Sequence, residues 1–241
     1  MTSYNRLRVL QLLYAWLGAA AFVASLAYFL FAYTVTFGET AAPAARSVPI
    51  VIDVALFSLF AFHHSLFART PLKDAVRAAL SPTMERTLYT WISSLLFATV
   101  CWAWQPVPGV LYSVPAPWQW LGFAVQAAGI AVTAAGSRVL DVLDLAGVRP
   151  VLQARGAQAP HVPLQTGGLY GFVRHPIYFG WLLFVFGTPH MTMTRLVFAL
   201  TSSTYLALAI PWEERGLIQA FGPDYQKYQQ RVRWRMLPFV Y

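Results

Sequence analysis

The chain has 241 residues, of which 58% are hydrophobic, 16% aromatic and only 11% charged. Soluble domains usually carry about 25% charged residues, so this composition excludes an ordinary water-soluble protein and predicts an all-α integral membrane protein. The net charge of +8 does not indicate nucleic-acid binding, because the basic residues follow the membrane topology. The length fits a single membrane domain, residues 1–241.

Apolar runs predict about six membrane segments, at about residues 9–37, 48–67, 88–104, 118–139, 177–188 and 196–212. The first segment and an outer loop occupy residues 1–47, three further segments occupy 48–139, and a cytoplasmic connection, a helical hairpin and the tail occupy 140–241. The first arm of the hairpin barely spans a bilayer. In the tail, Gly222-Pro223 predicts a break between two short amphipathic helices.

Basic residues gather on one side of these segments. Of the 17 Lys and Arg residues, all except Arg46 and Arg195 fall in the N-terminus, the second and fourth connections or the tail. This positive-inside bias places both termini in the cytoplasm. It predicts an integral protein of a bacterial-type inner membrane, in contact with anionic lipid headgroups.

Two charged pairs stand at the cytoplasmic ends of the hairpin. Arg174 and His175 precede Pro176, which is a usual first residue of a helix. Glu213 and Glu214 follow the last segment. The hairpin brings the pairs together, and two cations facing two carboxylates form either a structural clamp or a ligand site. The residues alone leave both interpretations open.

Ionisable residues also lie within the second segment. His63 and His64 are about 8–9 Å inside its cytoplasmic end at about 1.5 Å per residue. Such residues are functional candidates, although bonds to neighbouring backbone are the alternative. Asp53, near the outer end, is interpreted as a helix-pairing residue, and the single cysteine, Cys101, as a small buried side chain.

Metal and dinucleotide sites are not predicted. The five histidines form no i, i+4 pair, no HExxH motif is present, and the one cysteine has no partner. No GxGxxG motif follows a strand pattern. The glycine-rich stretch TGGLYG at 166–171 forms either an ordinary tight turn or a place where backbone comes close to a ligand.

Two motifs carry a resemblance to a known family: PLQTGGLYGFVRHPIYFGW at 163–181 and EERGLIQAFGPDYQKYQQRV at 213–232. They resemble the membrane methyltransferase superfamily, which includes isoprenylcysteine carboxyl methyltransferases and phospholipid N-methyltransferases. A closer likeness, to methanethiol S-methyltransferases and NnrU-like proteins, extends through FHHSLFAR (62–69), MERTLYT (84–90), WQP (104–106) and the turn at 187–199.

One stretch departs from the pattern of the thiol methyltransferases. In LDVLDLAGVRP (140–150), Asp141, Asp144, Gly147 and Arg149 fit the pattern, but Val142 stands where it has a histidine. If that histidine contacts the methyl acceptor, this chain has a different substrate.

The resemblance implies S-adenosylmethionine as the methyl donor, bound at the cytoplasmic helix ends without a Rossmann domain. Carried over by motif, the donor site comprises Leu164, Gln165, Tyr170, His175, Ile177, Tyr178, Glu213 and Glu214. Aromatic faces and a carboxylate suit the donor's sulfonium and ammonium groups. Arg174, or the amides after Pro176, suit its carboxylate.

The implied reaction is an in-line methyl transfer to a small or lipophilic thiol such as methanethiol. Beside Arg174, the predicted catalytic residues are His64, which orients or deprotonates the thiol, and Arg149, which stabilises its anion. The alternatives are methylation of an isoprenylcysteine carboxylate or of a phospholipid amine, and a non-enzymatic NnrU-like membrane protein. The sequence leaves the acceptor and the oligomeric state open.

Overall fold

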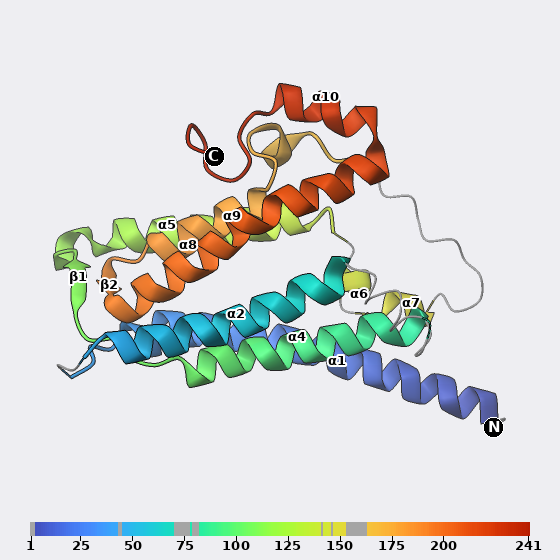
Figure 1. Ribbon diagram of the computed structural model, residues 1–241, viewed down its shortest axis with the longest axis horizontal. Helices are drawn as coiled ribbons and strands as arrows, with labels where there is room; N and C mark the ends of the chain where they lie inside the picture. The colour runs from blue at the N-terminus through green and yellow to red at the C-terminus, as the bar shows by residue number, and fades with distance from the viewer. Residues whose placement is uncertain are drawn as a thin grey trace. The chain divides into compact units, whose positions relative to one another are not determined.

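The computed structural model describes residues 3–42, 45–69, 78, 82–140, 142–145, 147–152 and 163–241. Nearly all of its elements are helices (Figure 1), which confirms the predicted fold class. Among the described residues, four helical stretches are long and apolar enough to cross a membrane: Arg6–Gly38, Ser47–Phe67, Ala116–Ser137 and Met193–Phe221. The other two predicted segments, at 88–104 and 177–188, are also helical. The first lies in the helix Pro82–Ala103, which is not among these four, and the second lies in the helix Pro176–Phe186, which is shorter than a membrane span.

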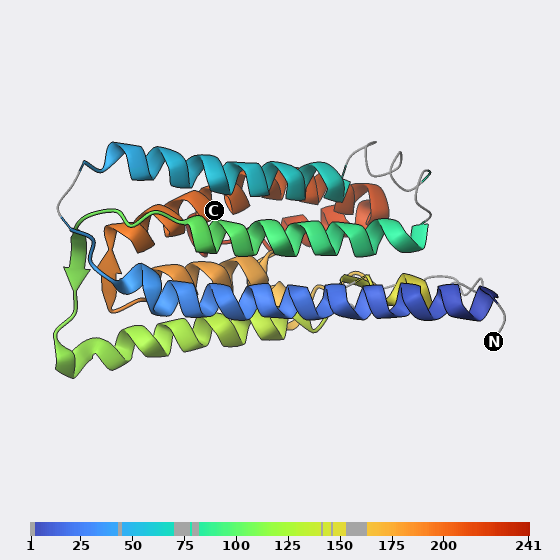
Figure 2. The same ribbon diagram turned by 90° about the horizontal axis from the view of Figure 1, so that it is seen from below.

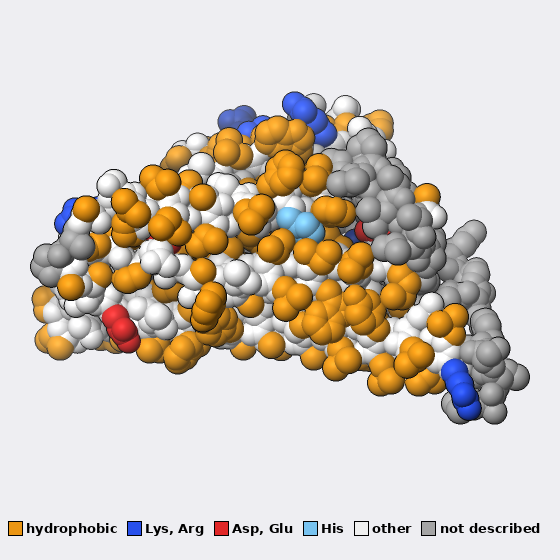
Figure 3. All heavy atoms as spheres, turned by 60° about the horizontal axis from the view of Figure 1, so that its bottom comes forward, with side chains coloured by type: hydrophobic (Ala, Val, Ile, Leu, Met, Phe, Trp, Pro, Cys, Tyr) orange, Lys and Arg blue, Asp and Glu red, His pale blue; other side chains and the backbone are white. Residues whose placement is uncertain are grey.

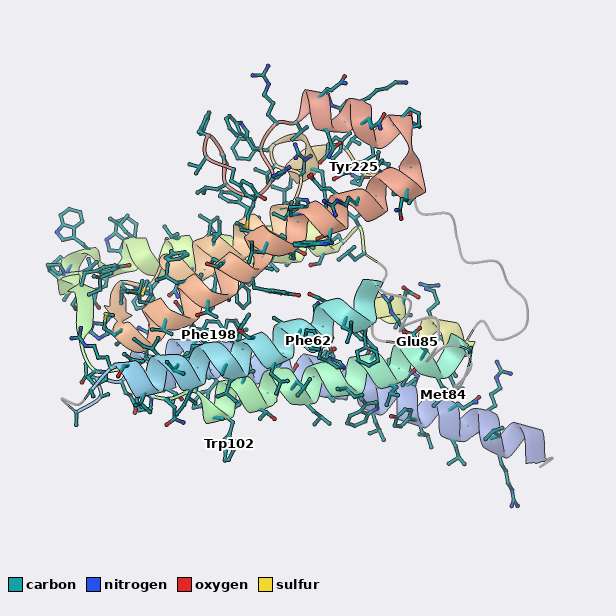
Figure 4. The ribbon with its side chains drawn as sticks, viewed as in Figure 1. Phe62, Met84, Glu85, Trp102, Phe198 and Tyr225 are labelled. Atoms are coloured by element: carbon teal, nitrogen blue, oxygen red, sulfur yellow. The ribbon has the colours of Figure 1, made fainter. Side chains whose placement is uncertain are left out.

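Hydrophobic side chains cover much of the surface. In the face drawn in Figure 3 they spread over the helices, and charged side chains are few. Trp102 is 77% exposed and Phe62 is 65% exposed, and Trp102 points away from its helix (Figure 4). Such a surface is unfavourable in water and fits lipid contact.

The chain forms two compact units. Unit 1 comprises Met1–Phe37, Ser47–Gln105 and Asp141–Pro160, and unit 2 comprises Gly38–Arg46, Pro106–Leu140 and His161–Tyr241. Both units are therefore assembled from segments that are distant in the sequence.

Unit 1 is built on three long helices: α1 (Ser3–Thr34), α2 (Ser47–Arg69) and α4 (Pro82–Ala103). Helix α4 lies between the other two (Figure 2). Aromatic rings join them, since Phe97 packs at 5.5 Å from Phe29 and 5.3 Å from Phe60 between ring centroids.

Polar contacts fix the ends of unit 1. The fully buried Asp53 accepts a 2.7 Å hydrogen bond from the backbone N–H of Gln105, which confirms its structural role. Cys101 is buried as well. At the other end, Arg86 pairs with Asp144 at 3.2 Å. This pair holds the short helices α6 (Val142–Leu145) and α7 (Arg149–Leu152) near the start of α4.

Unit 2 is centred on the contact between α5 (Gln119–Ser137) and α8 (Pro176–Phe186). The two helices meet at glycines, because a Cβ atom on Gly129 would lie 2.6 Å from the carbonyl oxygen of Gly180. Small residues allow helices in a membrane to pack this closely. Helix α8 has 11 residues, or about 16 Å of rise, so the prediction of a short first hairpin arm is confirmed.

A small sheet closes one end of unit 2. Strand β1 (Val110–Ser113) pairs antiparallel with β2 (His190–Thr192), which lies in the turn between α8 and α9 (Met193–Phe221). The sequence did not predict these strands, because three or four residues in a Pro- and Trp-rich loop carry no strand periodicity. Buried Arg195 braces the turn by donating to the carbonyl oxygen of His190 at 2.6 Å.

The tail differs from the prediction in one respect. Helix α9 continues past Trp212 to Phe221, so the first expected amphipathic helix is the end of α9. Pro211 lies within α9 and lacks the N–H that would bond the carbonyl of Ala207. The hydroxyl of Tyr241 donates to that carbonyl at 3.2 Å, which offsets the lost bond.

The predicted break at Gly222 is confirmed. Gly222 has φ = +55°, a conformation that glycine adopts readily, and it separates α9 from α10 (Pro223–Arg231). Tyr225 projects from α10 toward α9 (Figure 4). With Tyr228 and Val232 it forms a hydrophobic cluster against Leu164 and Tyr170.

Candidate functional site

The first feature of the site is a buried ion pair in unit 2. Arg174 Nε donates to Glu214 Oε1 at 2.6 Å, and the two residues are 8% and 3% exposed. Arg174 Nη1 also donates to the carbonyl oxygens of Val232 and Arg233 at 2.7 and 2.9 Å. Further donors approach Glu214 Oε2: Gln229 Nε2 at 3.1 Å and Arg235 Nε at 3.4 Å.

We call Arg174, Glu214 and these bonded groups the buried clamp. Burying a charge is unfavourable unless it is paired and hydrogen-bonded. Here both charges are compensated within the protein. The buried clamp therefore ties the start of α8, the end of α9 and the tail together.

Backbone hydrogen bonds explain how the tail comes to lie at the buried clamp. The N–H groups of Arg174 and His175 donate to the carbonyl oxygens of Trp234 and Arg235 at 2.9 and 2.8 Å. Pro176 then begins α8, as expected for a proline at the first helical position. The segment that precedes α8 is thus held by residues 60 positions further along the chain.

A second, more open group lies next to the buried clamp. Tyr178 donates its hydroxyl proton to Glu213 Oε2 at 2.7 Å, and the Glu213 side chain is 33% exposed. The ring of His175 stacks on that of Tyr178, with centroids 5.3 Å apart and planes 8° apart. His175 lies between the two features, since its Nδ1 is 3.8 Å from Glu213 and its Nε2 is 3.5 Å from Glu214. We call Glu213, Tyr178 and His175 the Glu213 group.

Tyr170 connects the glycine-rich turn to this region. Its hydroxyl donates to the carbonyl oxygen of Gly136 at 3.1 Å, and its own carbonyl accepts from the Tyr228 hydroxyl at 2.7 Å. Burial raises the pKa of the Tyr170 phenol, and the negative charge of Glu213 raises it further. Tyr170 is therefore a neutral hydrogen-bond donor within electrostatic range of Glu213.

A pocket of about 460 Å³ opens beside Tyr170 in unit 2. Its walls come from the end of α5 and from the glycine-rich turn, and its lining residues are Ala135, Arg138, Val139, Gln165, Gly167, Gly168, Leu169 and Tyr170. This volume lies within the range of small-molecule sites.

Most of the predicted site residues come together in unit 2. Leu164 packs against the hydrophobic cluster of α10, Gln165 lines the pocket, and Ile177 packs against Gly136. Tyr170, Arg174 and the Glu213 group are placed as described above. The sequence missed Gln229 and Arg235 of the buried clamp and Arg138 of the pocket, because their only sequence signal was membership of a basic or polar stretch.

The two other predicted catalytic residues lie in unit 1. His64 Nδ1 is 2.8 Å from the Tyr89 hydroxyl, and its ring packs against Phe60 at 5.5 Å. Arg149 begins α7. Asp141 lies outside the described residues, as does the side chain of Val142.

Comparisons with known proteins identify relatives of this chain. It is 35% identical to methanethiol S-methyltransferase 2 of Bradyrhizobium diazoefficiens over 93% of its own length and 89% of the relative's. It is 31% identical to methanethiol S-methyltransferase of Mycobacterium tuberculosis over 80% and 79% of the two chains. It is also 30% identical to the Nurim homolog of Drosophila melanogaster over 75% and 72%. No family model and no solved structure matches the chain.

The helical membrane architecture and these relatives place the chain in the class of membrane methyltransferases. Within that class, it belongs to the methanethiol S-methyltransferase family. The resemblance inferred from the motifs is thereby confirmed.

Proposed function

We propose that the protein transfers a methyl group from S-adenosylmethionine to a small thiol such as methanethiol, which yields dimethyl sulfide. The observation that carries the proposal is the 35% identity, over 93% of the chain, to a methanethiol S-methyltransferase. The structure supports it, because the residues expected to hold the donor meet at one end of unit 2.

The residues present fit this donor. Glu213 offers a partly exposed carboxylate to a sulfonium or ammonium cation. The half-buried ring of Tyr178, which stacks on the buried His175, offers an aromatic face. The pocket beside Tyr170 has room for a small molecule. We assign donor binding to the Glu213 group and the pocket, and we assign to Glu214 the role of holding Arg174 and His175 in place.

S-adenosylmethionine supplies an electrophilic methyl group on a sulfonium. The protein's part is to align the thiol sulfur, the methyl carbon and the leaving sulfur, since positioning provides much of the rate in such displacements. The thiol must lose its proton, because the thiolate is the nucleophile. We propose that His64, whose ring is fixed by the Tyr89 hydroxyl, orients or deprotonates the thiol and that Arg149 stabilises the thiolate.

We also propose that both termini face the cytoplasm of a bacterial-type inner membrane. In unit 2, Arg195 lies at the sheet end of the helices, whereas Arg138 and Arg174 lie at the opposite end. This distribution agrees with the positive-inside rule. Labelling of single cysteines placed after Arg46 and in the tail, in intact cells and in lysates, tests the orientation.

The acceptor is tested by supplying purified protein in lipid nanodiscs with S-adenosylmethionine labelled in its methyl group. Methanethiol, longer thiols, a farnesylcysteine analogue and a phospholipid amine are offered in parallel. We expect labelled dimethyl sulfide from methanethiol and weak transfer to the last two compounds. Transfer only to the farnesylcysteine carboxylate or only to the amine would overturn the thiol assignment.

A further inference from the structure

The pocket beside Tyr170 contains a cation, Arg138, that pairs with none of the residues that the structure describes. Arg138 caps the C-terminal end of α5 and lines the pocket. Its side chain is exposed and makes no hydrogen bond or ion pair with the part of the chain that the structure describes. Gln165 also lines the pocket, and its amide likewise has no partner among the described residues.

Arg174 is in the opposite situation. Its guanidinium is buried, paired with Glu214 and bonded to two backbone carbonyls. An anion that approached Arg174 would compete with a carboxylate already in place. Among the described residues Arg138 has no such competitor, and a guanidinium binds carboxylates strongly through two parallel hydrogen bonds.

The surroundings of Arg138 allow a ligand to come close. Gly167 and Gly168 also line the pocket, and a Cβ atom on either would meet no described residue within 4 Å. Tyr170 lines the same pocket and lies within electrostatic range of Glu213. A positive charge, that of Arg138, and a negative charge, that of Glu213, are therefore both present in the surroundings of Tyr170. A ligand with an anionic end and a cationic end matches this arrangement.

We propose that Arg138, assisted by the Gln165 amide, binds the α-carboxylate of the methyl donor, while the donor's cationic groups face Glu213. The inference rests on the proposed function. It moves the carboxylate-binding role from Arg174 and the amides after Pro176 to a residue that the motifs do not include. A lipid phosphate offers similar anionic chemistry, and the experiment separates the two sources.

The test compares S-adenosylmethionine with its decarboxylated form, which retains the sulfonium and ammonium and lacks only the carboxylate. Equilibrium binding of both is measured for the wild type, Arg138→Gln and Arg138→Lys in nanodiscs. We expect the wild type to prefer the carboxylated donor about tenfold or more, as for a charged hydrogen-bonded pair. Arg138→Gln loses this preference through weaker binding of the carboxylated form alone, and Arg138→Lys retains part of it.

Arg6→Gln is the matched control, because it removes one exposed positive charge from unit 1. It should leave both affinities unchanged. A wild-type preference that survives in Arg138→Gln overturns the inference, as does equal binding of both compounds by the wild type. In either case donor binding itself, and with it the proposed function, still stands. A folded wild type that binds neither compound overturns the proposed function and this inference with it.

The alternative, that Arg138 binds a lipid phosphate, is tested by native mass spectrometry of the same variants with phosphatidylglycerol. If Arg138→Gln loses bound phosphatidylglycerol and keeps its preference for the carboxylated donor, Arg138 binds a lipid phosphate and the inference is overturned. Unchanged phosphatidylglycerol binding together with a lost preference supports the donor carboxylate.

Discussion

Glu213 and Glu214 are adjacent in the sequence, yet they lie in different surroundings. Glu214 is 3% exposed and is approached by Arg174, Gln229 and Arg235. The Glu213 side chain is 33% exposed, and it accepts a hydrogen bond from the Tyr178 hydroxyl. Consecutive helical residues point about 100° apart, so one carboxylate faces inward and the other outward. This difference supports the proposal that the buried clamp stabilises the protein and that the Glu213 group binds the donor.

The largest expected effect concerns the buried clamp. Glu214→Gln leaves the buried guanidinium of Arg174 without its counter-ion, a loss that typically costs about 3–5 kcal/mol. Thermal unfolding in nanodiscs should therefore shift downward by about 10 °C. The double variant Arg174→Gln/Glu214→Gln should lose much less than the sum of the two single changes. Additive losses would show that the two charges do not depend on each other.

Glu213→Gln sharpens the comparison, because it makes the same chemical change one residue earlier. The amide oxygen can still accept the Tyr178 hydroxyl, so the unfolding temperature should change little. Affinity for S-adenosylmethionine should fall about tenfold or more, since a charged partner of the donor is lost. The control is Glu39→Gln, which removes an exposed carboxylate elsewhere in unit 2. Equal affinities for Glu213→Gln and the control would contradict the assignment.

Tyr178→Phe tests how Glu213 is positioned. The phenyl ring keeps its stacking on His175, but the 2.7 Å bond to Glu213 is lost. A neutral hydrogen bond contributes about 0.5–1.5 kcal/mol, so donor affinity should fall about fivefold. Isothermal titration with the donor measures the change. A loss as large as that of Glu213→Gln would assign the hydroxyl a direct contact with the donor.

The smallest effect separates two neighbouring tyrosines of α10. Burial raises the pKa of both phenols, so both are neutral at physiological pH. Tyr228 donates to the carbonyl of Tyr170 at 2.7 Å, whereas the Tyr225 hydroxyl has no hydrogen-bond partner among the described residues. Tyr228→Phe should lower stability by about 1 kcal/mol, and Tyr225→Phe should be neutral or slightly stabilising. Equal changes in unfolding temperature would contradict this difference.

Much of the fold could be predicted from hydropathy alone. The six helical segments and the short hairpin arm follow from the lengths of the apolar runs. The continuity of α9 could not be predicted, because Pro211 normally ends or kinks a helix. The compensating bond comes from Tyr241, 34 residues away.

The sequence predicted that most of the candidate residues of unit 2 lie close together, but it did not predict which of them pair with one another. The hairpin and the motifs predict that Arg174, His175, Glu213 and Glu214 lie close together. The backbone pairing of 174–175 with 234–235 has no sequence signature, since main-chain bonds do not depend on side-chain type. That pairing brings the tail, with Arg235, against Glu214 and so decides which carboxylate is enclosed.

The most direct test of the account is methyl transfer from labelled S-adenosylmethionine to methanethiol by the wild type and by Glu213→Gln. Both proteins should be folded, with similar unfolding temperatures. We expect labelled dimethyl sulfide from the wild type and, at a donor concentration well below the wild-type KM, about tenfold less or lower from Glu213→Gln. A folded wild type that transfers no label, or a Glu213→Gln variant that works at the wild-type rate, would contradict the account.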